Sequence, residues 1–278
     1  MSKKFFWLDG EFVEATPALL ESLTPGVLKA KGVFETMRAQ NGKVNFLATH
    51  LRRMSRGLKV LHLPPTIYHL KIYLNILELL KLNRLKTARV RLMIWRKGKI
   101  LHHAIVAQPL ERLTAAQYRK GFSASLTNGH HRETCVPIKS LDYGIFREGL
   151  RKARSAGFDE ALFVNRKGEL VEGSRTNIFL VKDNCLLTPP IASGCLPGVM
   201  RQQVISAARR LKIRCAAKPL NAQDLLTADE AFVTNALLGI MPLTGLDKQK
   251  INTGNPGPIT RRLARFYTTI QAMSPELD

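Results

Sequence analysis

Two tight-turn signals near the N-terminus restrict the fold more than any other feature of this sequence. Short apolar runs flank Asp9-Gly10 within residues 5–14, and an alternating segment at 32–38 leads into Asn41-Gly42. Asp-Gly and Asn-Gly favour the two-residue turns that join antiparallel strands. The chain is therefore predicted to begin with two β-hairpins.

Helical and strand patterns alternate through the rest of the chain and divide it into two parts. In residues 47–62, leucines and Met54 recur at helical spacing. A polar, proline-containing stretch separates these first elements from a second series. The sequence predicts two α+β domains with mixed sheets and helices: an N-terminal domain 1–108, a linker 109–117 and a C-terminal domain 118–278. Further helices are predicted at 66–82, with Thr66 as its cap, and at 144–156, 199–211, 221–226 and 258–273.

Length and composition are those of an ordinary globular protein. The chain has 278 residues, of which 45% are hydrophobic and 23% charged, so a sizeable core can be buried and a disordered chain is excluded. No stretch approaches the ~18 apolar residues that a membrane-spanning helix needs. The opening segment reaches the acidic Asp9 too soon for the apolar core of a signal peptide. We expect a cytoplasmic protein with no membrane partner.

The charge of the chain is unusually positive. Lysine and arginine number 43 against 21 acidic residues, which gives a net charge of +22. Such a charge favours anionic partners: nucleic acid, phosphorylated cofactors or polycarboxylates. Residues 84–99 form the densest basic run, but Trp95 is their only aromatic residue, whereas a nucleic-acid groove normally includes several stacking aromatics. Nucleic-acid binding is a remote alternative, and no nucleic-acid partner is expected.

The cysteines and histidines do not indicate a metal centre. The four cysteines lie at 135, 185, 195 and 215, without a Cys-x-x-Cys pair or a histidine at zinc-ligand spacing. The two adjacent histidine pairs, at 102–103 and 130–131, would point to opposite faces of an extended chain. We expect no metal and no disulfide.

Three segments have residue patterns that can support chemistry. In Leu196–Arg201, a Pro-Gly turn leads directly into a helix, whose free N–H groups can bind an anion. Lys139 lies among apolar residues, where a lysine can act as a neutral amine nucleophile. In Glu172–Asn177, an acid precedes several polar side chains at a turn. Each pattern also has a structural explanation: a helix start, a lysine that extends out of a strand, or a surface turn.

These segments belong to a longer series of motifs. In sequence order, the motifs are Gly32–Arg38, His50–Met54, Lys139–Tyr143, Asp159–Phe163, Val171–Phe179, Thr188-Pro189, Leu196–Arg201, Ala228–Phe232, Thr234–Leu237 and Met241-Pro242. The series resembles the class IV aminotransferases, the fold type IV enzymes that use pyridoxal 5'-phosphate. The family includes branched-chain aminotransferases, D-amino acid aminotransferases and 4-amino-4-deoxychorismate lyases. The resemblance covers nearly the whole chain and implies the two-domain α+β fold of the D-amino acid aminotransferase type.

The resemblance implies roles for individual residues toward the cofactor. Lys139 would bind the cofactor covalently and later carry the proton. Glu172 would face the pyridine nitrogen and keep it protonated, so that the ring can accept electrons. Arg53 would bind the phosphate, aided by the backbone N–H groups of Val199 and Met200 at a helix start.

Two positions depart from the pattern of the relatives. Asn235 and Ala236 would complete the phosphate site, but many relatives offer a threonine hydroxyl near Ala236, so contact here can come only from the backbone. Branched-chain enzymes have a tyrosine near the cofactor's ring hydroxyl, where this chain has Gly144. Whether Tyr143 takes its place is left open.

The motifs also bear on the reaction. D-amino acid aminotransferases have a tyrosine where this chain has Phe34, and a histidine that is missing after Arg96. Branched-chain enzymes share Phe34 and Arg38 but usually read Gly-Ile-Thr-Arg, where this chain has Gly-Val-Met-Arg201. The Met-Arg pair and the run 235–242 most resemble the aminodeoxychorismate lyases. We therefore predict a lyase of the folate pathway that releases 4-aminobenzoate and pyruvate, with a branched-chain or D-amino acid aminotransferase as the alternative.

The predicted substrate is a small amino compound with two carboxylates. Arg38 and Arg96 are the candidate partners for these carboxylates, beside Phe34, although each arginine can equally be an ordinary strand cation. Because family members place each active site against a second subunit, a homodimer is expected.

Overall fold

The computed structural model describes residues 3–273 except 26, 29, 65–67 and 131–136. Contacts divide them into two units. The first runs to Glu111 and includes Ile138–Gly144, and the second contains Arg112–Pro137 and Ile145–Met273. The segment 138–144, which carries Lys139 and was assigned to the C-terminal domain, thus groups with the first unit. The predicted domain boundaries stay a prediction.

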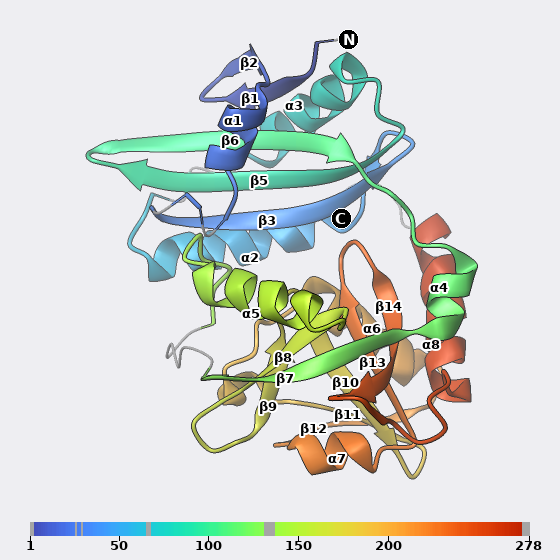
Figure 1. Cartoon of the computed structure of the whole chain (residues 1–278). Coiled ribbons are helices and arrows are strands. Elements are labelled where there is room, and N and C mark those ends of the chain that lie inside the picture. The colour runs from blue at the N-terminus through green and yellow to red at the C-terminus, as the bar shows by residue number, and fades with distance from the viewer. Residues whose placement is uncertain (1–2, 26, 29, 65–67, 131–136, 274–278) are drawn as a thin grey trace. The chain divides into compact units, whose positions relative to one another are not determined.

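The first unit is built on a six-stranded antiparallel sheet in the order β2-β1-β6-β5-β3-β4. Both predicted hairpins are present, with Asp9-Gly10 and Asn41-Gly42 at positive φ in the turns. The long strands β3, β5 and β6 pair along their whole length (Figure 1). The strands are β1 (Phe5–Leu8), β2 (Glu11–Glu14), β3 (Lys31–Gln40), β4 (Lys43–Val44), β5 (Thr87–Lys97) and β6 (Ile100–Pro109).

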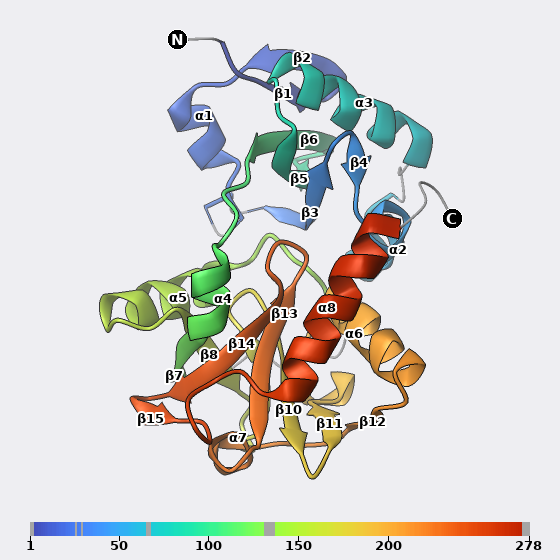
Figure 2. The same cartoon turned by 90° about the vertical axis from the view of Figure 1, so that its right-hand side faces the viewer.

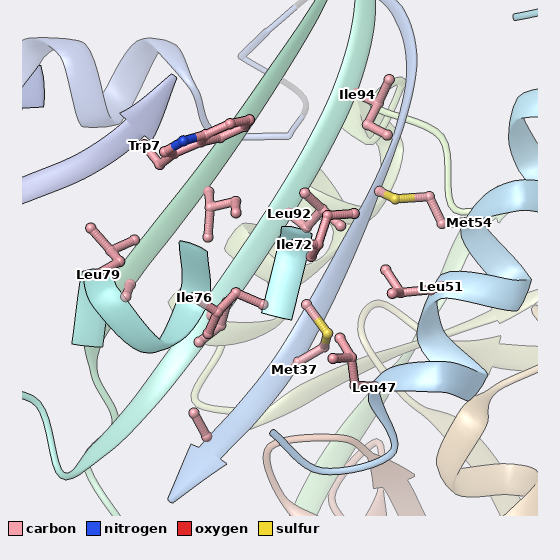
Figure 3. Close-up of a cluster of buried hydrophobic side chains, with 14 of the residues drawn as sticks. Trp7, Met37, Leu47, Leu51, Met54, Ile72, Ile76, Leu79, Leu92 and Ile94 are labelled. Atoms are coloured by element: carbon pink, nitrogen blue, oxygen red, sulfur yellow. The ribbon is translucent and has the colours of Figure 1, made fainter. Parts of the chain in front are cut away.

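Two helices cover one face of this sheet, α2 (Leu47–Val60) and α3 (His69–Leu82). Side chains of α2, including Leu51 and Met54, point toward β3 and β5 and fill a dry core with Met37 and Leu92 (Figure 3). The helix α3 begins at His69, and the predicted cap Thr66 lies outside the described residues. The short helix α1 (Pro17–Ser22), capped by Thr16, contributes partly buried leucines to a second cluster around Phe34 on the other face.

The second unit contains a nine-stranded sheet in which parallel and antiparallel pairs are mixed. Figure 2 shows α8 beside β13, β14 and α6. The strands are β7 (Phe122–His130), β8 (Glu160–Val164), β9 (Leu170–Gly173), β10 (Asn177–Lys182), β11 (Cys185–Thr188), β12 (Arg214–Ala217), β13 (Glu230–Asn235), β14 (Gly239–Leu246) and β15 (Gln249–Lys250). The helices are α4 (Ala115–Lys120), α5 (Gly144–Ser155), the 3-10 turn η1 (Ile191–Ser193), α6 (Val199–Arg210), α7 (Ala222–Leu226) and α8 (Pro258–Met273).

Candidate functional site

Lys139 lies in a short extended segment that pairs with the edge of β3. The N–H of Phe34 donates to the carbonyl of Lys139 over 2.9 Å, and the N–H of Leu141 donates to the carbonyl of Gly32 over 3.0 Å. The strand β4 pairs only with the last residues of β3, so this part of the edge can pair with the Lys139 segment. The lysine is therefore fixed to the sheet by backbone bonds rather than carried on a free loop.

Two aromatic rings surround the Lys139 amine. Its Nζ lies 4.6 Å from the centroid of the Phe34 ring and 5.6 Å from that of Tyr143. The two rings meet edge to face with centroids 5.3 Å apart. Both distances are within the range of a cation–π contact. The partly buried amine thus has a defined position, which a nucleophile requires.

On the helix-covered face of β3, a buried acid holds two residues of α2. Glu35 is fully buried and accepts two hydrogen bonds from Arg53, from Nε over 2.7 Å and from Nη2 over 2.6 Å. His50, one turn before Arg53, places Nδ1 2.7 Å from the same carboxylate. This Glu35–His50–Arg53 cluster fixes Arg53 in one orientation, because a bidentate pair restricts both rotation and tilt of the guanidinium.

The charge states of this cluster follow from its burial and its partners. Burial alone would raise the pKa of Glu35, but the charges and hydrogen bonds of Arg53 and His50 lower it to about 2. Burial lowers the pKa of His50, and the cations Arg53 and Lys139 lower it further, against the opposing effect of Glu35. At neutral pH the carboxylate is ionised and the imidazole is neutral. Nδ1 therefore carries the proton and donates it to Glu35.

The strand register separates the two arginines predicted to bind substrate. Arg38 lies opposite Arg89, and Phe34 lies opposite Met93. Because side chains alternate between the two faces along a strand, all four lie on the same face of β3 and β5. Arg96 lies opposite Lys31, on the other face and seven residues along β3 from Arg38. Within the first unit, the structure does not bring Arg38 and Arg96 together.

A different arginine takes the place next to Phe34. Arg91 lies opposite Thr36, one step along the same face from Phe34, and the Arg38–Arg89 pair follows one step farther. Like charges on directly opposed residues destabilise a sheet unless an anion or acceptor compensates them. The side chains of Gln40 and Gln108 accept from Arg38 and Arg89. We call Arg38, Arg89 and Arg91 the arginine face.

In the second unit, Glu172 is held beside the start of α6. Glu172 is 8% exposed, and its carboxylate accepts from the N–H of Leu196 over 3.1 Å and from Nδ2 of Asn177 over 3.5 Å. Asn177 also donates to the carbonyl of Leu196 over 2.9 Å. The ends of β9 and β10 are therefore tied to the loop before α6, and the carboxylate has a fixed orientation.

The first turn of α6 is open at its N-terminus. The N-cap residue, Gly198, has no side chain that could accept a hydrogen bond from the first N–H groups of the helix. These include the N–H groups of the buried residues Val199 and Met200. A Cβ at Gly198 would lie 1.9 Å from Oδ1 of Asn177, so only glycine fits there. Free N–H groups and the helix dipole together favour an anion at such a helix start.

Asn235 forms the turn between β13 and β14. Its Oδ1 accepts from the N–H groups of Leu237 and Leu238 over 2.9 and 2.8 Å, and its Nδ2 donates to the carbonyl of Arg175. The side chain of Asn235 is thus occupied in shaping the turn. A contact of Asn235 or Ala236 with a phosphate would have to come from the backbone.

The structure joins the predicted residues into two sets. Phe34, Lys139 and Arg38 share one face of the first sheet, and Arg53 lies behind it in the buried cluster. Glu172, Val199 and Met200 meet around the start of α6. The sequence reasoning missed Glu35, His50, Arg89 and Arg91. The alternation along the strands, combined with the register of β3 and β5, could have shown that Arg89 and Arg91 lie on the Phe34 face. The i, i+3 spacing of His50 and Arg53 could have shown that both lie on one side of their helix.

Each of the two sets, taken by itself, contains groups of the kind that pyridoxal 5'-phosphate requires. The cofactor needs an amine for its aldehyde, cationic or N–H donors for its phosphate and an acid for its ring nitrogen. Lys139 supplies a positioned amine, and Glu172 supplies a buried, oriented carboxylate. Arg53 and the glycine-capped start of α6 supply phosphate donors.

The described part of the chain has neither a cluster of metal ligands nor a helix suited to cross a membrane. No group of three or more potential metal ligands occurs there. None of its helices combines the length and apolar character that crossing a membrane requires. Cys185, Cys195 and Cys215 are free thiols, and Cys135 lies outside the described residues.

Comparison with known proteins agrees with this chemistry. The family model for amino-transferase class IV matches residues 32–246. A Methanocaldococcus jannaschii protein named as a branched-chain-amino-acid aminotransferase is 32% identical over 95% of this chain and 96% of its own length. The aminodeoxychorismate lyase of Bacillus subtilis is 30% identical over 94% of this chain and 92% of its own. A T.th. branched-chain amino acid aminotransferase, solved with pyridoxamine 5'-phosphate, superposes with a TM-score of 0.86 at 23% identity, over 98% and 96% of the two chains.

The family match defines the class of protein, a pyridoxal-phosphate enzyme. The chain belongs to the class IV aminotransferase family. The α+β fold, the enzymatic nature and the cofactor predicted from the sequence are thereby confirmed.

Proposed function

We propose that this protein is a 4-amino-4-deoxychorismate lyase of the folate pathway that converts its substrate to 4-aminobenzoate and pyruvate. The arginine face carries this proposal. The substrate has two carboxylates, and three arginines lie along the face that also carries Phe34 and the Lys139 amine. The Bacillus subtilis lyase, similar over nearly the whole chain, gives further support.

We assign the cofactor residues as the motifs imply. Lys139 would hold the cofactor covalently, Arg53 and the N–H groups of Val199 and Met200 would bind its phosphate, and Glu172 would pair with its ring nitrogen. The bound cofactor supplies an electron sink for the carbon that bears the amino group. The backbone of Asn235 and Ala236 completes the phosphate site.

The chain's own residues perform the proton transfers. The Lys139 amine would take the proton from the substrate carbon that bears nitrogen. It would return this proton to the enolpyruvyl group, which leaves the neighbouring carbon as pyruvate while the ring becomes aromatic. Substrate and products have the same atoms, so no amino acceptor is consumed. Arg91 and Arg38 hold the carboxylates during these steps.

One experiment tests the reaction. Purified protein is incubated with aminodeoxychorismate and no keto acid, and 4-aminobenzoate and pyruvate are measured. Equal amounts of both are expected, with far slower amino transfer from leucine or D-alanine to a keto acid. Amino transfer from leucine or D-alanine without 4-aminobenzoate would refute the lyase and leave the cofactor unaffected.

A transaminase is the second candidate, favoured by the likeness to the Methanocaldococcus jannaschii protein. The first proton removal would be the same, and Lys139 would then deliver the proton to the cofactor. We further propose that two copies form a homodimer. The cytoplasmic location expected from the sequence stays a prediction.

A further inference from the structure

One ring nitrogen of the Glu35–His50–Arg53 cluster has no evident role. His50 is 1% exposed, and its Nε2 is buried with no hydrogen-bond partner in the part of the chain that the structure describes. Leaving such a group unsatisfied costs about 1–3 kcal/mol, so buried polar atoms of this kind require an explanation. One such explanation is a ligand that supplies the missing hydrogen-bond partner of Nε2.

Three charged side chains act on His50. Glu35 faces it from β3, Arg53 from the next turn of α2, and the charge of Lys139 acts on it from the edge segment. The helix packs closely on β3 because Gly57 has no side chain: a Cβ there would lie 2.9 Å from Val33. His50 lies next to the guanidinium of Arg53 in the same cluster, and the charge of Lys139 also acts on it.

The charge balance shows what a phosphate would change. Glu35 and Arg53 cancel each other, and His50 is neutral, so the cluster offers an arriving phosphate no net positive charge. A phosphate monoester carries a charge of roughly −1.5 to −2 at neutral pH. The lone pair of a neutral Nε2 would repel the phosphate oxygens. A protonated Nε2 would instead donate a charge-assisted hydrogen bond to one of them.

We propose that His50 is a phosphate-binding residue of the cofactor site, which takes up one proton from solvent at Nε2 when the phosphate binds beside Arg53. Glu35 positions both side chains and stabilises the imidazolium through Nδ1. The proposal rests on the assignment of Arg53 to the phosphate. It does not depend on which reaction the enzyme catalyses.

Calorimetry separates the phosphate-linked proton from all others. Cofactor-free full-length protein is titrated with pyridoxal 5'-phosphate or with pyridoxal, each in two buffers of different ionisation enthalpy. At pH 8 the free phosphate, with a second pKa of about 6, is already fully ionised. Any proton exchanged at Lys139 is common to both ligands. We expect the phosphorylated ligand to take up more protons than pyridoxal, by a difference that approaches one.

Variants assign that proton to a residue. His50→Asn keeps a donor for Glu35 but cannot titrate, so the difference between the two ligands should vanish. His62→Asn is the matched control, because His62 is exposed and its φ of 50° suits asparagine. It should behave as the wild type. Equal proton uptake with both ligands in the wild type, or a difference that survives in His50→Asn, would overturn the proposal.

Two further measurements keep the test decisive. If His50→Asn does not fold, nitrogen NMR of histidine-labelled wild type replaces it. The phosphorylated ligand must convert one neutral histidine to the doubly protonated form at pH 8, and pyridoxal must not. Arg53→Ala tests the underlying assignment, since it should reduce the preference for the phosphorylated ligand about ten- to a hundredfold, the worth of a charge-assisted bond. An unchanged preference would place the phosphate elsewhere.

Discussion

Replacing Glu35 with glutamine should destabilise the protein by about 3 kcal/mol. The side chain is 0% exposed, so solvent does not weaken its interactions. Its pKa falls from 4.5 to about 2. At 1.36 kcal/mol for each pKa unit, this difference corresponds to roughly 3 kcal/mol of stabilisation. Removing one partner of a buried ion pair costs about 3–5 kcal/mol, which agrees with that figure.

The pH dependence of this effect has a definite sign. Because the pKa of Glu35 is lower in the folded protein, its contribution is complete above the ordinary pKa of 4.5 and is lost as pH falls toward 2. The free energy of urea unfolding of wild type and Glu35→Gln should differ by about 3 kcal/mol at pH 7 and by about 2 kcal/mol at pH 3.5.

A control variant separates burial from charge. Glu148→Gln removes an exposed acid that also pairs with an arginine, Arg151, and should leave the unfolding midpoint unchanged. Equal stability of Glu35→Gln and wild type at pH 7, or a difference that stays constant down to pH 3.5, would refute the buried ion-pair reasoning.

Three other predictions follow from the site. The purified protein should absorb visible light through its cofactor, and Lys139→Ala should abolish that absorbance; borohydride reduction and peptide mapping that mark another lysine would contradict the assignment. Arg91→Ala and Arg38→Ala should raise KM for aminodeoxychorismate about ten- to a hundredfold through loss of a charge-assisted bond, while the exposed Lys97→Ala should not; a KM unchanged in both arginine variants would remove the arginine face from the site. Sedimentation at micromolar concentration should show a homodimer, and an active monomer would exclude it.

The local structure was largely predictable from the sequence because it depends on neighbours along the chain. Asp9-Gly10 and Asn41-Gly42 adopt the positive φ values that their turns require, and leucine spacing predicted α2. The segments of Lys139, Glu172 and Gly198 were recognised because each couples a distinctive residue to a distinctive local backbone. The helix α3 begins at His69, and its predicted cap Thr66 lies outside the described residues.

Pairing between distant segments was decided only by the tertiary structure. Alternation along β3 places Glu35 and Arg38 on opposite faces of the sheet. It does not reveal that α2 packs on the Glu35 face and brings His50 and Arg53 to this acid. A polar residue in an alternating strand is normally expected to face solvent, yet Glu35 is buried because two residues of a helix neutralise and hydrogen-bond it. The choice of Arg91 over Arg96 as the neighbour of Phe34 likewise required the register of β3 with β5, since a shift of one residue moves every side chain to the other face.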